Sequence, residues 1–349
     1  MPRALGENMN LFNRFAIMCL WASFLHACSG ETTEVSGGGV GPDNSGSIVR
    51  VDPAFDALVP QGAKIEKLAG GFVFTEGPVW DRRGNRLYFS DLRNNAIHTW
   101  SDEEGLKTFL QPVFEGEAAH ESVGANGLTI DRQGRLVLME HGNRLVSRIE
   151  VNGSRTILAH SYGFSRLNSP NDSVWHSNGW LYFTDPSYGL ARLESDPLRE
   201  LDFNGIYRLY PESGELQLLE KAQSRPNGIS FSLDERTLYV ANSDGNNKVW
   251  YAYDVTDSGE LSDQRIFFDV NDRDAAGAAD GMKVDVNGNI FATGPGGVWV
   301  LDNEGNHLGN INPPELPANV AWGGDGSVLY MTARTGLYRI SLTTRGAIL

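Results

Sequence analysis

The sequence predicts an all-β protein, a six-bladed β-propeller, and two observations lead to this fold. One hairpin pattern recurs six times, and no stretch with helical periodicity interrupts the copies. The copies start with EGPVW at residue 76, NGLTI at 126, NDSVW at 171, NGISF at 227, DGMKV at 280 and NVAWG at 319. Their starts lie 39 to 56 residues apart, which is the spacing typical of propeller blades with four strands each.

Each copy contains a turn where a β-hairpin needs one. Asp, Asn and Gly recur in these turns because Asp and Asn bond the nearby backbone and Gly accepts positive φ. The flanking runs are rich in Val, Ile, Leu, Tyr and Phe, as half-buried strands are. Further strand-like runs between the copies supply the third and fourth strands; they are 96–100, 145–151, 205–210, 248–253 and 297–301.

The last copy is followed only by the strand-like run 336–342, so its blade lacks one strand. We predict that the N-terminal run 64–74 joins this last blade and closes the ring. A β-sandwich with irregular hairpins is the alternative fold.

The composition excludes some partners. The chain has 349 residues, of which 40% are hydrophobic and 21% are charged, values typical of a soluble globular protein. The net charge of −15 excludes nucleic acid, because phosphate binding needs a basic surface. An acidic surface instead favours solubility, or attracts cations toward a site.

The first thirty residues differ from the rest of the chain. Arg14 precedes the apolar run FAIMCLWASFL at 15–25, which ends shortly before Cys28. A basic residue followed by about ten apolar residues and a small residue is typical of a secretory signal peptide. The ending LHAC at 25–28 resembles a bacterial lipobox, in which a lipidated Cys28 becomes the first mature residue. Ordinary cleavage nearby is the alternative.

We therefore predict a signal peptide with a lipobox at 1–28, a flexible linker at 29–47 and the propeller catalytic domain at 48–349. The linker is rich in Gly, Ser and Thr and has no apolar periodicity. Cys19 and Cys28 are the only cysteines, so the propeller has neither a disulfide nor a thiolate metal site. We expect an exported, periplasmic protein that contacts a bacterial membrane only through a lipid anchor at Cys28.

The residue that opens each copy is always acidic or an amide. In a propeller the innermost strands surround a central channel, so equivalent positions at their starts form a ring of oxygen donors. The alternative is that these residues cap turns, a role that Asn and Asp often have. Six such residues favour a central metal-binding channel, and they are Glu76, Asn126, Asn171, Asn227, Asp280 and Asn319.

The donor type selects the metal. Oxygen donors without His or Cys suit hard cations, and Ca²⁺ accepts six to eight of them in irregular geometry. Glu76 and Asp280 carry two negative charges, which one divalent ion neutralises. Zn²⁺ is the second choice because it usually takes nitrogen or sulfur ligands.

Several motifs around these residues resemble a known family. They are FTEGPVW at 74–80, ANGLTIDRQGRLVLMEHGNR at 125–144, SPNDSVW at 169–175, FTDPSYG at 183–189, RPNGI at 225–229 and ADGMKVD at 279–285. The chain resembles the senescence marker protein/gluconolactonase/luciferin-regenerating enzyme family from about 72 to 335, most of all its bacterial gluconolactonases. This resemblance implies a six-bladed propeller with one divalent ion, held by Glu76, Asn171, Asn227 and Asp280. Members hydrolyse lactones, with Ca²⁺, Zn²⁺, Mg²⁺ or Mn²⁺ in the site.

Two residues are candidates for activating the water that attacks a lactone. The ion would polarise the lactone carbonyl, and a base must then remove a proton from the water. Asp280 is the first candidate, since a carboxylate on the ion also reaches an adjacent water. His141, at the end of the run LVLME, is the second, and a locally bonded turn histidine is its alternative role.

We assign Asn126, Asn171 and Tyr188 to substrate binding. Tyr188 lines the sugar pocket or, alternatively, packs between blades. Asp172, beside Asn171, either bonds the backbone or holds a second ion, and we favour the backbone role.

These expectations together describe a metal-dependent lactonase that acts on sugar lactones such as glucono-1,5-lactone. One alternative is a related hydrolase for other lactones or organophosphate-like esters. The other is a propeller without catalysis that binds a sugar acid or a protein.

Overall fold

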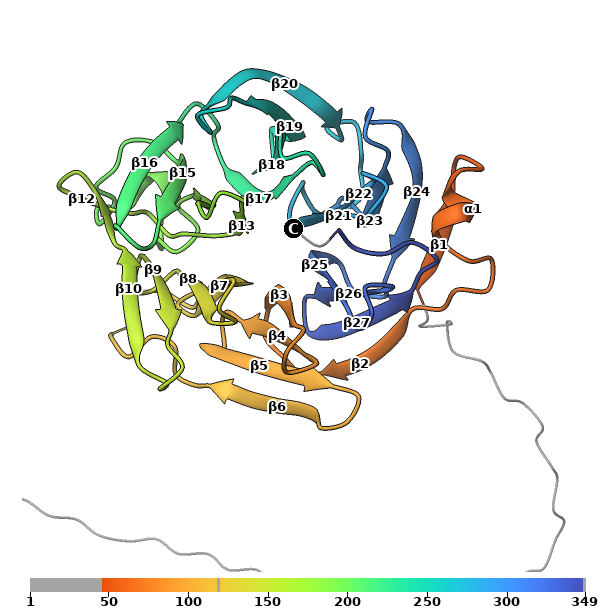
Figure 1. Cartoon of the computed structure of the whole chain (residues 1–349), viewed down its shortest axis with the longest axis horizontal. Helices are drawn as coiled ribbons and strands as arrows, with labels where there is room; N and C mark the ends of the chain where they lie inside the picture. The colour runs from red at the N-terminus through yellow and green to blue at the C-terminus, as the bar shows by residue number, and fades with distance from the viewer. Residues whose placement is uncertain (1–45, 118–119, 348–349) are drawn as a thin grey trace, which may run out of the picture. The chain divides into compact units, whose positions relative to one another are not determined.

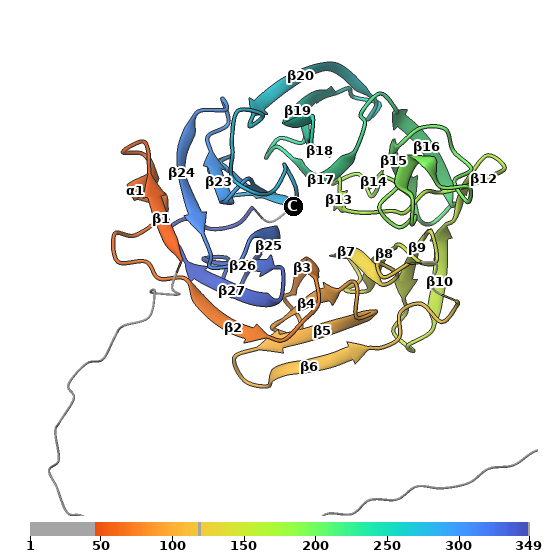
Figure 2. The same cartoon turned by 180° about the vertical axis from the view of Figure 1, so that it is seen from behind.

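The computed structural model describes residues 46–117 and 120–347, and it confirms the six-bladed propeller. Figure 1 shows six sheets around a central axis, and Figure 2 shows the same ring from behind. The predicted signal peptide, the lipobox and nearly all of the linker lie outside the described residues. In the described ranges, no helix has the length and apolar character needed to cross a membrane.

The first three blades are four-stranded antiparallel sheets. Blade 1 contains β3 (Thr75–Asp81), β4 (Arg86–Asp91), β5 (Ala96–Ser101) and β6 (Gly105–Leu110). Blade 2 contains β7 (Ala125–Ile130), β8 (Leu136–Glu140), β9 (Leu145–Ile149) and β10 (Arg155–Ala159). Blade 3 contains β13 (Ser173–Trp175), β14 (Leu181–Asp185), β15 (Gly205–Tyr210) and β16 (Glu215–Glu220). The small hairpin of β11 (Ser161–Tyr162) and β12 (Ser165–Arg166) connects blades 2 and 3.

Blades 4 to 6 complete the ring, and the last two of them each include one strand from the N-terminal segment. Blade 4 contains β17 (Pro226–Phe231), β18 (Thr237–Asp244), β19 (Asn247–Val255) and β20 (Leu261–Asp269). Blade 5 contains β21 (Met282–Val284), β22 (Ile290–Gly294), β23 (Gly297–Leu301), β24 (His307–Asn312) and, outermost, β1 (Ser47–Arg50). Blade 6 contains β25 (Pro317–Gly323), β26 (Val328–Ala333), β27 (Gly336–Ser341) and β2 (Glu66–Gly70).

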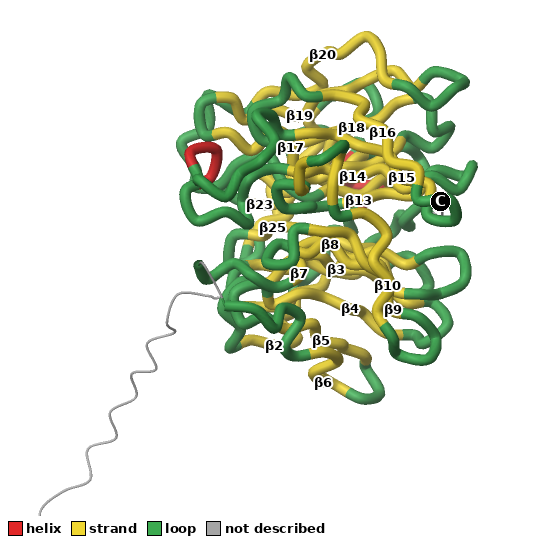
Figure 3. The backbone as a smooth tube through the Cα atoms, turned by 90° about the vertical axis from the view of Figure 1, so that its left-hand side faces the viewer, coloured by secondary structure: helices red, strands yellow, loops and turns green. Residues whose placement is uncertain are grey.

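Strands make up most of the regular structure, as Figure 3 shows in yellow. Helix is confined to two short turns in the described residues, α1 (Phe55–Leu58) and the 3-10 turn η1 (Leu193–Ser195). The predicted runs 205–210 and 297–301 coincide with β15 and β23, and the other third strands agree within two residues at each end. These strands could be predicted because their hydrophobic patterning and their turns are local features of the sequence.

The ring closes as predicted, through a strand from the N-terminal segment. β2 pairs antiparallel with β27, from Glu66 opposite Arg339 to Gly70 opposite Gly336. A second closure was not predicted: β1 pairs with β24 and gives blade 5 a fifth strand. The four residues of β1 follow directly on a polar linker, so their pattern alone does not indicate a strand.

Aromatic side chains fill the space between neighbouring blades. The Trp80 ring of blade 1 stacks on Tyr330 of blade 6, with centroids 5.4 Å apart. Trp322 of blade 6 meets the ring of Phe291 in blade 5 edge-on, at 4.9 Å. In both cases the tryptophan, which lies early in its sequence copy, faces the preceding blade of the ring.

Glu315 fastens the closure of blade 6. Its carboxylate accepts hydrogen bonds from Lys67 Nζ at 2.9 Å and from the Tyr338 hydroxyl at 2.6 Å, so it joins β2 to β27. It also accepts from the backbone N–H of Thr335 at 2.8 Å and from its hydroxyl at 2.6 Å. Partial burial alone would raise the pKa of Glu315, but these hydrogen bonds outweigh burial and lower the pKa to about 2.

We expect Glu315→Gln to lower the free energy of unfolding by about 2 kcal/mol at pH 7, because the charged hydrogen bonds across the closure are lost. The folded-state pKa lies below the usual 4.5, so this stabilisation is present above pH 4.5 and disappears as the pH falls toward 2. Urea denaturation of both proteins between pH 2 and 7 measures it, with the exposed Glu212→Gln as control. A difference that persists unchanged at pH 2 would contradict this role.

Candidate active site

The residues that open the six copies lie in or directly before the innermost strands. Each innermost strand contacts the innermost strand of both neighbouring blades, so the six strands form a closed ring. Five of the six residues are less than a tenth exposed and Asp280 is half-buried. They are Glu76 in β3, Asn126 in β7, Asn171 before β13, Asn227 in β17, Asp280 before β21 and Asn319 in β25.

β-bulges aim several of these side chains, a feature that sequence reasoning missed. The pairing register shifts between Glu76 and Val79 in β3, between Ala125 and Leu128 in β7, and between Pro226 and Ile229 in β17. A bulge places an extra residue in one strand and redirects its side chain. Each of these three bulges contains the opening residue and the glycine after it. That glycine is the feature of the sequence from which the bulge could have been predicted.

These glycines let neighbouring innermost strands approach closely. A Cβ atom on Gly127 would lie 2.4 Å from the carbonyl oxygen of Asn171. One on Gly228 would lie 2.3 Å from the carbonyl oxygen of Asp280. Any larger residue would therefore push the next opening residue out of place.

In blades 1, 3 and 4, a side chain at or near the end of the second strand binds the backbone just before the residue that opens the copy. Asp91, at the end of β4, accepts hydrogen bonds from the backbone N–H groups of residues 73 and 74. Asp185, at the end of β14, does the same for residues 168 and 169, at 2.8 and 2.7 Å. Asn242 in β18 accepts from the N–H of Arg225 at 2.8 Å. The ring residues follow two or three positions later, so their backbone is fixed by each blade.

Three carboxamides form a directed chain across blades 2, 3 and 4. Asn126 Nδ2 donates to Asn171 Oδ1 at 2.7 Å, and Asn171 Nδ2 donates to Asn227 Oδ1. Asn227 Nδ2 in turn donates to Ser243 Oγ at 3.0 Å. Three of the predicted ring residues are thus in direct contact.

Three carboxylates share the same buried channel. Burial raises the pKa of Glu76 to about 7, opposed by the Gly77 N–H and reinforced by the charge of Asp172. Burial, followed by the charges of Glu76 and Asp172, raises the pKa of Asp280 well above its usual value. Lys283 is the nearby cation that acts in the opposite direction on Glu76. With all three carboxylates ionised, the channel would carry an excess of negative charge that one nearby lysine does not balance.

Asp172 takes the backbone role that the sequence analysis favoured. Its Oδ1 accepts from the N–H of Ser173 at 2.8 Å. Its Oδ2 accepts from Asn319 Nδ2 at 3.2 Å, a bond that crosses from blade 3 to blade 6. Both of its oxygens are thus engaged by the protein.

His141 is fully buried directly behind the amide chain. Its Nε2 lies 3.3 Å from Asn171 Oδ1, whereas its Nδ1 has no hydrogen-bond partner among the described residues. Burial lowers the pKa of His141 to about 3, although the contact with Asn171 opposes this shift. The imidazole is therefore neutral and contacts one predicted ligand.

Tyr188 lies on the connection 186–204 between β14 and β15, which is far longer than the corresponding turns of the other blades. Its hydroxyl forms a hydrogen bond with Ser243 Oγ. Burial raises the pKa of Tyr188, so the phenol is protonated near neutral pH. The structure thus places Tyr188 at the end of the amide chain.

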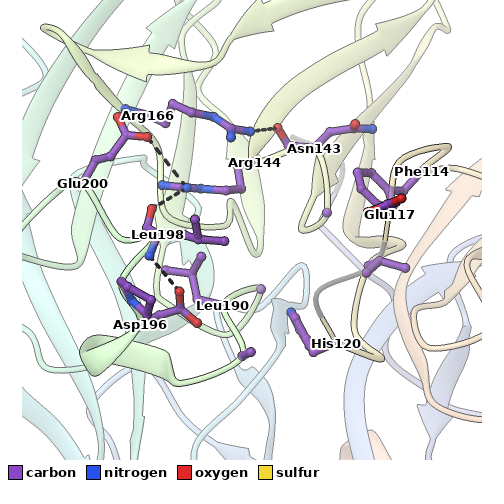
Figure 4. Close-up of a pocket in the computed structure, with 15 residues that line it drawn as sticks. Phe114, Glu117, His120, Asn143, Arg144, Arg166, Leu190, Asp196, Leu198 and Glu200 are labelled. Carbon is purple, nitrogen blue, oxygen red and sulfur yellow. Dashed lines mark hydrogen bonds and ion pairs between the residues drawn. The ribbon is translucent and has the colours of Figure 1, made fainter. Parts of the chain in front are cut away.

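Two cavities border these residues. One, of about 440 Å³, is lined by Gly142 and Gly189 and lies next to His141 (Figure 4). Figure 4 shows Arg144 pointing across it toward Leu198, whose carbonyl oxygen accepts from Nη1 at 2.7 Å. The other cavity is about 100 Å³, and Asp280 lines it. Asp280 therefore borders open space, whereas His141 does not line either cavity.

The ring offers a donor set suited to a hard cation. Within residues 46–117 and 120–347, no group of three or more His, Cys, Asp or Glu side chains is placed to hold a metal ion. Side-chain amide oxygens of the ring asparagines would therefore have to complete the set of metal ligands. Asp280 Oδ1 is buried without a hydrogen-bond partner among the described residues, and a cation would satisfy it. This oxygen and the neighbouring carboxylate of Glu76 fit a divalent ion.

Comparison with known proteins identifies the family. Residues 74–335 match the family described as SMP-30/Gluconolactonase/LRE-like region. This chain belongs to that family. The match spans all six inner strands, so the ring described above is the centre of an SMP-30/gluconolactonase propeller.

Several proteins similar to this chain are named lactonases. A gluconolactonase from Zymomonas mobilis is 34% identical over 312 residues, covering 86% of this chain and 87% of its own. A pentonolactonase from Haloferax volcanii is 30% identical over 274 residues, 75% of this chain and 81% of its own. The structure of a gluconolactonase from Xanthomonas campestris has a TM-score of 0.76 at 30% identity, covering 85% of this chain and 95% of its own.

We expect Gly228→Ala to lower the free energy of unfolding by about 1–3 kcal/mol, because its Cβ would overlap the carbonyl oxygen of Asp280. Gly245→Ala, on the same blade, has nothing within 4 Å of the new Cβ and serves as control. Urea denaturation measures both variants. Equal stability of the two would show that the innermost strands are not tightly apposed.

Proposed function

We propose that this protein hydrolyses sugar lactones such as glucono-1,5-lactone, using one divalent cation in the channel. The observation that carries the proposal is the ring of buried Glu76, Asn171 and Asn227 with half-buried Asp280 in a member of this family. The identity to the Zymomonas mobilis gluconolactonase, over most of both chains, supports the substrate class.

Glu76, Asn171, Asn227 and Asp280 would hold the cation, which we propose to be Ca²⁺, with Zn²⁺, Mg²⁺ or Mn²⁺ as alternatives. Oxygen donors and the absence of nitrogen and sulfur from this set favour a hard cation over Zn²⁺. When bound, the cation polarises the lactone carbonyl and stabilises the charge that develops on its oxygen.

Asp280 is the base that the geometry favours. Its Oδ1 has no hydrogen-bond partner among the described residues, and its side chain borders a cavity. In the proposed reaction the Asp280 carboxylate accepts a proton from the attacking water while the new carbon–oxygen bond forms. The same carboxyl returns the proton to the ring oxygen as the ester bond breaks, which yields the open hydroxy acid.

His141 is the second candidate, and its burial favours another role. It is fully buried and touches Asn171 Oδ1, so it orients that amide more readily than it meets a water. Asn126, Asn171 and Tyr188 would contact the hydroxyl groups of the lactone. The cavity of about 440 Å³, lined by the glycines that follow His141 and Tyr188, lies within the size range of ligand pockets, and we propose that it admits the rest of the sugar.

We further propose that the protein is exported and anchored by a lipid at Cys28. The apolar run 15–25 and the lipobox-like ending at 25–28 support this location. A periplasmic site would place the enzyme where extracytoplasmic sugar oxidation releases lactones.

We expect lactone hydrolysis to stop after chelation and to return with Ca²⁺, and Asp280→Asn to reduce kcat by about 10²–10⁴-fold, as loss of a general base does. Acid release from five- and six-membered aldonolactones measures both effects, with spontaneous hydrolysis subtracted. Folded protein without turnover under every cation would favour the binding propeller instead.

We expect His141→Gln to change kcat by less than about tenfold, well below the loss of a general base, since an amide can still contact Asn171. Steady-state kinetics beside Asp280→Asn separate the two residues. A loss in His141→Gln as large as in Asp280→Asn would make His141 the base.

A further inference from the structure

Ser243 lies at the end of β18, where its side chain reaches the amide chain. Its Oγ accepts from Asn227 Nδ2 at 3.0 Å, and the Tyr188 hydroxyl bonds to the same oxygen. Its own backbone N–H is engaged elsewhere, by the carbonyl oxygen of Arg225 at 3.0 Å. Ser243 was not among the sequence-predicted site residues.

The contact with Ser243 determines which way the amide of Asn227 points. A carboxamide has an acceptor oxygen on one side and a donor nitrogen on the other. Because Nδ2 donates to Ser243, Oδ1 turns toward Asn171 and the ring. The reverse orientation would direct two N–H groups at the ring, where they would repel a cation.

Tyr188 supplies a fixed partner for Ser243. The connection that carries Tyr188 is held to blade 4 by two hydrogen bonds of 3.1 Å from the Arg225 guanidinium to the Glu194 carboxylate. It is held to blade 2 by Arg144, only 5% exposed, which donates to the carbonyl of Leu198. A serine oxygen has two lone pairs and can accept from Tyr188 and Asn227 together.

We propose that Ser243 is a positioning residue that, together with Tyr188, orients the Asn227 carboxamide for cation binding. The inference rests on the proposed function, because it requires Asn227 to be a ligand of the cation. Groups that bond to the far side of a metal ligand fix its orientation, and losing them typically weakens metal affinity 10- to 100-fold.

The test measures cation affinity without any lactone. Chelator-treated full-length protein is titrated with Ca²⁺ alone, and then with Mn²⁺ alone, by isothermal calorimetry. We expect Ser243→Ala to weaken binding by about tenfold or more. Ser243→Thr keeps a hydroxyl and should restore most of the affinity, and Tyr188→Phe should produce a smaller loss in the same direction.

Two matched controls lie on the same blade. Ser232→Ala removes a hydroxyl that bonds to Asp234 in the β17–β18 turn, and Tyr251→Phe removes one that accepts from Asn247. Both should bind the cation as the wild type does. Thermal unfolding of every variant establishes that it is folded.

The outcomes separate this inference from the proposed function. Equal affinity of wild type and folded Ser243→Ala overturns the inference alone. If Ser243→Ala does not fold, Tyr188→Phe decides, and unchanged affinity there overturns it. A wild-type protein that binds neither cation refutes the proposed metal site and the inference with it.

Discussion

Glu76, Asp172 and Asp280 place their carboxylates in one buried channel. Burial raises the pKa of both Glu76 and Asp280, the charge of Asp172 raises both further, and the charge of Glu76 adds to the shift of Asp280. Such a group of like charges destabilises a fold unless hydrogen bonds or a positive charge compensate it. The protein supplies part of the compensation through the Gly77 N–H, Asn319 and Lys283. The carboxylate charge that these groups leave uncompensated makes the site attractive to a cation. The bulge at Glu76 and the close contacts between innermost strands matter because they hold these carboxylates near one another.

Much of the fold was predictable because its determinants are local. Turn residues and alternating apolar runs specify the hairpins, and their repetition specifies the blades. The closing strand β2 was predictable because blade 6 visibly lacked one. The ring was predictable because equivalent positions of a symmetric fold must meet at its axis.

Other features depend on contacts between blades, which no local pattern encodes. β1 pairs with a strand more than 250 residues away. The direction of the amide chain depends on Ser243. In the sequence Ser243 is one polar residue near the end of a strand, and nothing there indicates its contact with Asn227. The bond from Asp172 to Asn319 crosses the channel between opposite blades, so sequence reasoning found its backbone partner and missed its other one.

β1 and β2 also constrain the order in which the chain can acquire its structure. Their partners, β24 and β27, leave the ribosome only after blades 1 to 4. Joining segments so far apart carries a large loop-closure entropy, and contacts of this range slow folding. Blades 1 to 4 can form as local hairpins, but their circle stays open and its edges stay exposed until β24 and β27 have been synthesised. The nascent chain therefore has a long interval in which unpaired strands require protection from aggregation.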